Sequence, residues 1–377
     1  MKAPLLYIVA GEASADALGG GLMREIKKIF PTIRICGVGG DAMQREGLRS
    51  LFPYGELSIM GFAEVLPHIP RVLARLRETA IDIHNQQPDV VVTIDSPGFN
   101  FRLARALKNN AVTSHITRIH YVAPSVWAYK PQRARKTAEL FNALLALLPW
   151  EPPYFEKEGL PTTYIGHPVL WQEHNGNKIG FYAKHQIAQD TKLLLLLPGS
   201  RPGEIKHQLP VFLEAAKAMP EYKVMVLAGP QVQTTIRNMV PPGTLVVDIH
   251  EKQDAFASAA LALSKSGTVT LELAAAGVPT VVAHRVSAFS AWLLRRMVLV
   301  PYVSLVNLAA KKEIIPELLQ ERCNVSTITQ TLQALASPQA TQQQRDEYKA
   351  AIAMLRGATQ THPDTAAAQA VARLIQK

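Results

Sequence analysis

The sequence predicts two consecutive α/β lobes, each built on a parallel β-sheet that helices cover on both faces. Apolar runs rich in Val, Ile and Leu recur along the chain without alternation, as in strands buried on both sides. Each run leads into a polar loop and then an amphipathic stretch. A polar segment over residues 170–190 interrupts this pattern once, after which it restarts. At 377 residues the chain is long enough for two domains.

The first lobe is predicted over residues 1–170. Residues 5–30 have the pattern of a strand, a turn and a helix, and further strand-and-helix units follow at 33–47, 88–110 and 116–141. Two more strands are predicted at 143–148 and 163–166. The second lobe is predicted over 171–345, with units at 192–219, 222–230 and 244–284. Residues 346–377 are predicted to form a C-terminal helix.

The composition narrows the classes of function. A net charge of +10 favours an anionic partner, such as a phosphorylated substrate, an anionic membrane surface or nucleic acid, although many soluble proteins are simply basic. Nucleic acid is disfavoured because no stripe of basic residues alternates with aromatic ones. Cys36 and Cys323 form no metal-ligand spacing and fit a reducing cytosol. No apolar run reaches the roughly 20 residues of a membrane span, and no signal peptide is recognised.

The loops that leave the carboxyl ends of the strands are the expected binding sites, in the cleft between the lobes. Gly199-Ser200-Arg201 follows a buried strand directly. Glycine lets the backbone approach a ligand, serine offers a hydroxyl, and the arginine fork matches phosphate oxygens. The alternative is an arginine that only makes a surface ion pair.

A second loop of this kind lies in the stretch LSKSGTVTLELAAAGVPTVV, residues 263–282. Ser266, Gly267 and Thr268 precede a helix, where they either cap it or bind a phosphate group. Glu272 lies one turn further along an otherwise apolar helix. It either favours the helix dipole or accepts both hydroxyls of a ribose. Together these residues predict a nucleotide-diphosphate site, with Arg201 opposite the phosphates.

The first lobe lacks both the G-x-G-x-x-G and the P-loop patterns. Asp95 ends the apolar run VVVTID and is the first choice for a general base, or else the N-cap of the helix that follows. Glu12 follows the first strand, and Ser14 and Asp16 are possible N-caps. No Asp-x-Asp pair is present to hold a divalent ion, so neither a metal nor a cofactor is predicted.

Two stretches, at 58–80 and 289–307, combine apolar bulk with arginines. They either pack as ordinary amphipathic helices or contact an anionic membrane surface or acyl chains. The residues assigned to this membrane or acyl patch are Met60, Phe62, Leu66, Trp292, Arg295 and Arg296.

Nine motifs follow one another along the chain: GEASADALGGGL, GVGGDAM, IMGFAEVL, PDVVVTIDSPGFN, HYVAPSVWAY, YIGHP, LLLPGSRPGEI, SGTVTLELAAAGVPTVVAHR and YVSLVNL. Together they resemble the lipid-A-disaccharide synthases, a glycosyltransferase family (family 19) of the GT-B superfamily. The resemblance implies a GT-B fold with two Rossmann-like lobes, a C-terminal helix over residues 346–377 that returns to the first lobe, and an inverting, metal-independent transfer. The implied substrates are UDP-2,3-diacylglucosamine and 2,3-diacylglucosamine 1-phosphate (lipid X), and the implied products are the β-1,6 lipid A disaccharide 1-phosphate and UDP.

The resemblance also assigns roles to residues. Asp95 is the implied base for the acceptor's 6-hydroxyl, with Glu12 as its rival, and Ser14 and Asp16 are assigned to the acceptor side. Ser200, Arg201, Ser266, Gly267, Thr268, Glu272 and Asn307 are assigned to UDP. A cytoplasmic location, peripheral contact with the inner membrane and a homodimer are expected. The nearest alternatives are a peptidoglycan glycosyltransferase and a UDP-sugar epimerase.

Overall fold

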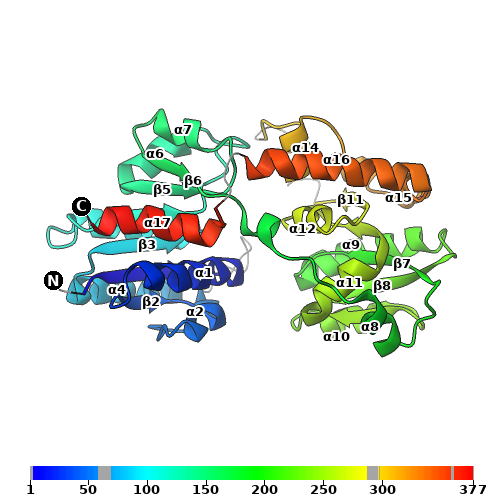
Figure 1. The fold of residues 1–377 in the computed structure, drawn as a ribbon, viewed down its shortest axis with the longest axis horizontal. Helices are drawn as coiled ribbons and strands as arrows, with labels where there is room; N and C mark the ends of the chain where they lie inside the picture. Colours follow the sequence, from blue (N-terminus) through cyan, green and yellow to red (C-terminus); the bar gives the residue numbers. More distant parts are fainter. Residues whose placement is uncertain (1–2, 58–68, 287–295, 297, 358–360, 377) are drawn as a thin grey trace. The chain divides into compact units, whose positions relative to one another are not determined.

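The computed structural model describes residues 3–57, 69–286, 296, 298–357 and 361–376 (Figure 1). The chain divides into two compact units, which we call the N-lobe and the C-lobe. The N-lobe comprises Met1–Pro168 and Gly357–Lys377, and the C-lobe comprises Val169–Arg356. The long helix α16 (Pro338–Arg356) therefore belongs wholly to the C-lobe, whereas the sequence analysis had assigned its last turns to the C-terminal segment.

The N-lobe contains a six-stranded, all-parallel sheet in the order β2-β1-β3-β4-β5-β6. Every residue of β1 and β3 is buried, because helices cover both faces of the sheet. The strands are β1 (Leu5–Ala10), β2 (Arg34–Val38), β3 (Val90–Ile94), β4 (Thr117–Tyr121), β5 (Ala143–Ala146) and β6 (Thr162–Tyr164). The helices are α1 (Ala13–Ile29), α2 (Asp41–Arg45), η1 (Tyr54–Glu56), α4 (Ile69–Gln86), α5 (Pro97–Asn109), α6 (Arg133–Leu140), α7 (Pro152–Glu156) and α17 (Pro363–Ile375).

The last helix, α17, packs along α1 at the edge of the glycine run of residues 19–21 (Figure 1). A Cβ atom on Gly21 would lie 2.3 Å from the carboxyl carbon of Asp364. The guanidinium of Arg24 donates to that carboxylate at 2.9 Å. Gly19 and Gly20 similarly make room for Met43 and Ala42 of α2. These glycines thus permit close packing between helices.

The C-lobe repeats the architecture with the order β12-β11-β10-β7-β8-β9, again all parallel. Its strands are β7 (Lys192–Leu197), β8 (Tyr222–Ala228), β9 (Leu245–Asp248), β10 (Ala259–Ser264), β11 (Thr280–His284) and β12 (Glu317–Leu319). Its helices are η3 (Pro168–Trp171, whose first residue closes the N-lobe), α8 (Lys178–Lys184), α9 (Pro202–Ala216), α10 (Gln233–Met239), η4 (Ile249–Glu251), α11 (Lys252–Ser258), α12 (Val269–Ala275), α14 (Leu305–Ala310), η5 (Gln320–Arg322), α15 (Val325–Leu335) and α16. Two apolar clusters fill the space on either side of this sheet.

Strand order fixes where each sheet can hold a ligand. In the C-lobe the chain builds outward from β7 in one direction and then from β10 in the other, so the order reverses between these two strands. In the N-lobe the reversal lies between β1 and β3. Loops that leave neighbouring strands at such a switch point diverge and leave a crevice at the carboxyl edge of the sheet. The expected sites are therefore the loops after β7 and β10, and those after β1 and β3.

Candidate active site

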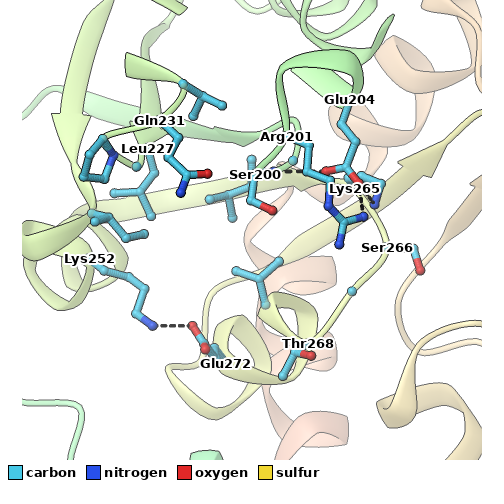
Figure 2. Close-up of a pocket in the computed structure, with 18 residues that line it drawn as sticks. Ser200, Arg201, Glu204, Leu227, Gln231, Lys252, Lys265, Ser266, Thr268 and Glu272 are labelled. Carbon is cyan, nitrogen blue, oxygen red and sulfur yellow. Dashed lines mark hydrogen bonds and ion pairs between the residues drawn. The ribbon is translucent and has the colours of Figure 1, made fainter. Parts of the chain in front are cut away.

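A cavity of about 720 Å³ opens at the switch point of the C-lobe (Figure 2). This volume is in the range of small-molecule sites, roughly 300–1,000 Å³. The loops after β7 and β10 form one side of it, and residues near the start of α11 and in α12 form another. Its lining residues include Ser200, Arg201, Ser266, Gly267, Thr268 and Glu272, six of the seven residues assigned to UDP from the sequence.

The loop after β7 depends on Gly199. Its φ of 128° is a conformation that side-chain-bearing residues rarely adopt. A Cβ atom there would lie 2.5 Å from Oε2 of Glu204, on the first turn of α9. That carboxylate accepts a hydrogen bond from the backbone N–H of Ser200 at 3.1 Å. The turn therefore folds back onto Glu204 and holds Ser200 and Arg201 at the cavity.

Glu204 also organises the cations of the cavity. Its Oε1 lies 3.1 Å from Nζ of Lys265 and 3.4 Å from Nη1 of Arg201. Burial acts to raise the pKa of Glu204, but Lys265, the Ser200 N–H and Arg201 outweigh it, so the pKa lies below its usual value. Figure 2 shows these contacts converging on one carboxylate. An anion bound here meets two cations that are already in place.

Glu272 lies on the far side of the cavity, on α12. Its Oε2 forms an ion pair with Nζ of Lys252, the first residue of α11, at 2.8 Å (Figure 2). The Glu272 side chain is 16% exposed, so its carboxylate is largely buried yet faces the cavity. Lys252 holds it in one position. Four further residues line the cavity that were not predicted as site residues from the sequence: Glu204, Gln231, Lys252 and Lys265.

Asn307, the seventh residue assigned to UDP, is not among the residues that line this cavity. Its side chain is completely buried in α14. The amide oxygen accepts the N–H groups of Ile314 and Ile315, and the amide nitrogen donates to Ile315 O and to Glu317. These four bonds use its full hydrogen-bonding capacity. In this structure Asn307 therefore braces the segment before β12.

In the N-lobe, Asp95 lies directly after β3, at the other switch point. Asp95 and Ser96 have φ values of 50° and 44°, which are uncommon for residues other than glycine. Asn100 braces this turn by donating from its amide nitrogen to the Asp95 carbonyl at 2.7 Å. Burial raises the pKa of the Asp95 carboxyl, and a hydrogen bond from the Ser96 backbone partly offsets this. Strain of this kind is commonly found at functional sites.

The loop after β1 lies next to Asp95. Ala10 pairs with Ile94 in the sheet, and a Cβ atom on Gly11 would lie 3.0 Å from Oγ of Ser96. Glu12 is the half-buried N-cap residue of α1, and Ser14 is exposed in its first turn. The structure thus brings Glu12 and Asp95 to the same edge of the sheet.

Asp16 has a different environment from the one the sequence suggested. Its two carboxylate oxygens accept the backbone N–H groups of Gly40 at 2.7 Å, Ala42 at 2.8 Å and Met43 at 3.1 Å. It is buried and caps the start of α2 instead of α1. Asp16 therefore holds the GVGGD loop in place, because both of its carboxylate oxygens accept backbone N–H groups of that loop.

Of the residues assigned to the membrane patch, Met60, Phe62, Leu66, Trp292 and Arg295 lie outside the described residues, and Arg296 is exposed. Within the described part of the chain, no helix is long and apolar enough to span a bilayer. The described residues also contain no group of three or more His, Cys, Asp or Glu side chains that could hold a metal ion.

Solved structures that resemble this fold include a UDP-sugar epimerase and a glycosyltransferase. UDP-GlcNAc 2-epimerase from Neisseria meningitidis, solved with UDP-GlcNAc, matches with a TM-score of 0.64 at 14% identity, over 99% of each chain. The calicheamicin glycosyltransferase CalG4 matches with a TM-score of 0.61 at 13% identity, over 100% of this chain and 99% of that one. At such low identities the likeness concerns the fold. Two Rossmann-like lobes of this kind define the GT-B class.

Sequence comparison identifies the family within that class. The family model for lipid-A-disaccharide synthetase matches residues 6–371. The lipid-A-disaccharide synthase of Granulibacter bethesdensis is 40% identical over 395 residues, covering 100% of both chains. That of Rhodospirillum centenum is 41% identical over 388 residues, covering 100% of this chain and 96% of its own. The chain belongs to the lipid-A-disaccharide synthase family, and it is an enzyme of lipid A disaccharide synthesis.

Proposed function

We propose that this enzyme transfers the sugar of UDP-2,3-diacylglucosamine to the 6-hydroxyl of 2,3-diacylglucosamine 1-phosphate (lipid X). The acceptor oxygen forms a bond to C1 of the donor sugar while the bond from C1 to the β-phosphate oxygen breaks. UDP departs with that electron pair, and a base on the enzyme takes the hydroxyl proton. A single displacement inverts the configuration at C1 and gives the β-1,6 linkage.

The observation that carries the proposal is the chemistry of the C-lobe cavity. A buried, positioned carboxylate at Glu272 is suited to accept hydrogen bonds from ribose hydroxyls. The cavity is also lined by two residues with cationic side chains, Arg201 and Lys265, and by three with hydroxyls, Ser200, Ser266 and Thr268, so a diphosphate can lie there. Two solved neighbours with this fold were crystallised with UDP-GlcNAc or UDP. These features support binding of the UDP-sugar donor in the C-lobe.

The N-lobe supplies candidate bases. Asp95 is the first choice, because a carboxylate whose pKa burial has raised accepts a proton more readily near neutral pH than an ordinary one. Glu12, on the adjacent loop, is its rival. The leaving diphosphate is stabilised by cations of the protein in place of a metal ion. EDTA is therefore expected to leave turnover unchanged, and a strict requirement for Mg²⁺ would contradict this part of the proposal.

Peripheral membrane contact is proposed through α4. Ile69 and Leu73 are 40% and 41% exposed on this helix, and the exposed side chains of Arg71 and Arg77 lie nearby in sequence. Apolar groups beside arginines suit the surface of an anionic bilayer. We expect co-sedimentation with anionic vesicles to fall in the variant I69S/L73S and to stay unchanged in the control I179S, at an exposed position of the C-lobe. The cytoplasmic location and the homodimer remain predictions.

A product assay tests the proposed reaction. The enzyme is incubated with UDP-2,3-diacylglucosamine, with and without lipid X, and released UDP and lipid products are measured. UDP release that depends on lipid X, with the disaccharide 1-phosphate as product, supports the proposal. UDP release without lipid X indicates a hydrolase, and conversion of the donor sugar without UDP release indicates an epimerase; either result overturns it.

A further inference from the structure

Lys265 has a position in the C-lobe cavity that none of the sequence motifs revealed. It is the first residue after β10, and its backbone N–H donates to the carbonyl of Leu197 at the end of β7 at 2.8 Å. This bond ties the two loops of the switch point together. The side chain is 19% exposed and lines the cavity directly before Ser266 (Figure 2). A lysine with four rotatable side-chain bonds can move its ammonium group within such a space.

The partner of Lys265 is the carboxylate of Glu204, which it shares with Arg201. One carboxylate thus faces two cations. His284, at the end of β11, does not add a third cation, because burial and the charge of Lys265 lower its pKa to about 4. The ammonium of Lys265 and the guanidinium of Arg201 together have more N–H donors than one carboxylate can accept, so they can also bind a further anion.

We propose that Lys265 is a second cation for the diphosphate of the donor, and that Glu204 is the internal counter-ion that phosphate oxygens replace. This inference rests on the proposed UDP site. The contacts with Glu204 hold the Lys265 and Arg201 side chains at the cavity, which limits the side-chain entropy lost on binding. When UDP binds, the Lys265 ammonium exchanges one carboxylate oxygen for a phosphate oxygen.

The same exchange favours the transfer step. As the bond from C1 to the phosphate oxygen breaks, negative charge grows on the departing UDP. A lysine beside it stabilises that charge more in the transition state than in the bound donor, which is the condition for accelerating the reaction. Lys265 therefore contributes both to diphosphate recognition and to leaving-group departure.

A purely structural role for the ion pair is the competing explanation. In that case Lys265 only neutralises Glu204, and the variant K265M weakens UDP binding because it exposes a repulsive carboxylate. The two explanations separate in a background that lacks this carboxylate. In the variant E204Q, a structural lysine has nothing left to neutralise, whereas a phosphate-binding lysine keeps its ligand.

The experiment measures UDP affinity by calorimetry for the wild type, E204Q, K265M and the double variant E204Q/K265M. We expect K265M to lower the affinity about ten- to a hundredfold, and the double variant to lose a similar factor relative to E204Q, as for one charge-assisted hydrogen bond. K265R should recover part of the affinity. Uridine, followed by ligand-detected NMR, should bind the wild type and K265M equally. The control K217M removes an exposed lysine paired with Glu214 at 2.6 Å and should bind UDP normally.

Equal UDP affinity of E204Q and E204Q/K265M would overturn the inference, as would an equal loss for uridine and UDP in K265M. Either result would leave the proposed UDP site intact, because the wild type still binds UDP. If the wild type itself bound no UDP, the proposed function would fail first. Thermal denaturation of each variant shows whether a loss of affinity reflects a loss of folding.

Discussion

Replacing Gly199 with alanine is expected to disrupt the side of the C-lobe cavity that is proposed to bind the diphosphate. The backbone at this position has a φ of 128°, where a residue with a Cβ atom costs about 1–3 kcal/mol. The new methyl group would also lie 2.5 Å from Oε2 and 2.7 Å from Cβ of Glu204. The second of these atoms is close to the backbone of α9, so the clash cannot be relieved by rotating the end of a flexible side chain.

The consequence for UDP follows from the contacts of Glu204. If this residue shifts, it loses the N–H of Ser200 and its hold on Lys265 and Arg201. A cost of about 2 kcal/mol, expressed at the site, corresponds to a loss of UDP affinity of roughly 30-fold. Calorimetric titration of G199A with UDP measures this, and thermal denaturation measures the part of the cost that appears as lost stability.

Gly203 provides a matched control four residues away. It lies in the first turn of α9, it has no unusual φ, and no heavy atom is within 4 Å of the position that its Cβ would take. G203A should bind UDP like the wild type and be slightly more stable, because alanine favours a helix by about 1 kcal/mol over glycine. Normal UDP affinity and stability in G199A, or equal losses in both variants, would refute this account of the loop.

Two further predictions concern the N-lobe. D95N should lower turnover by a factor of about 10² to 10⁴ while UDP affinity is unchanged. In the wild type, the acid limb of the pH–rate profile should report a pKa above that of an ordinary carboxyl, because burial raises the pKa of Asp95. Wild-type turnover in D95N together with inactivity of E12Q would instead make Glu12 the base. Glu151 is buried, and burial raises its pKa from 4.5 to about 7 despite hydrogen bonds from Trp127 and the backbone. The folded state then holds the proton of the Glu151 carboxyl more tightly than the unfolded state does. The free energy of unfolding should therefore fall by roughly 3 kcal/mol or less as pH rises from about 4.5 to 7. E151Q should flatten this slope in denaturant titrations at several pH values, and an unchanged slope would show that Glu151 is not its source.

The lobes and most strands were predictable because buried parallel strands have a distinctive composition. Within the predicted unit at 244–284, the structure places the end of α11 directly before β10. The three-residue strand β12 was not predicted, since a run that short carries little periodic signal. The C-terminal return to the first lobe was expected, but only α17 belongs to the N-lobe, while α16 stays with the C-lobe.

The candidate site was predictable where residues follow a strand directly, as Arg201 and Ser266 do. Lys252 was not predictable as a site residue, because it begins a helix after β9 and its ion pair with Glu272 joins two segments that are far apart in the sequence. Lys265 lies within the stretch of residues 263–282, yet the sequence could not show that its side chain lines the cavity. Asp16 and Asn307 have the polar character of ligand-binding residues, but the fold uses them to satisfy backbone N–H groups. Strand order, which decides where a crevice opens, is likewise not contained in the pattern of any one strand.

The C-lobe cavity is proposed to bind UDP with its ribose on Glu272, and titrations with UDP and a 2′-deoxy analogue test this binding mode. UDP and 2′-deoxy-UDP are titrated into the wild type, E272Q and the control E214Q, whose glutamate forms an exposed ion pair elsewhere on the lobe. We expect the wild type and E214Q to prefer UDP over 2′-deoxy-UDP about tenfold or more, and E272Q to lose both this preference and a similar factor in UDP affinity. Full UDP affinity and an unchanged preference for the 2′-hydroxyl in E272Q would contradict it.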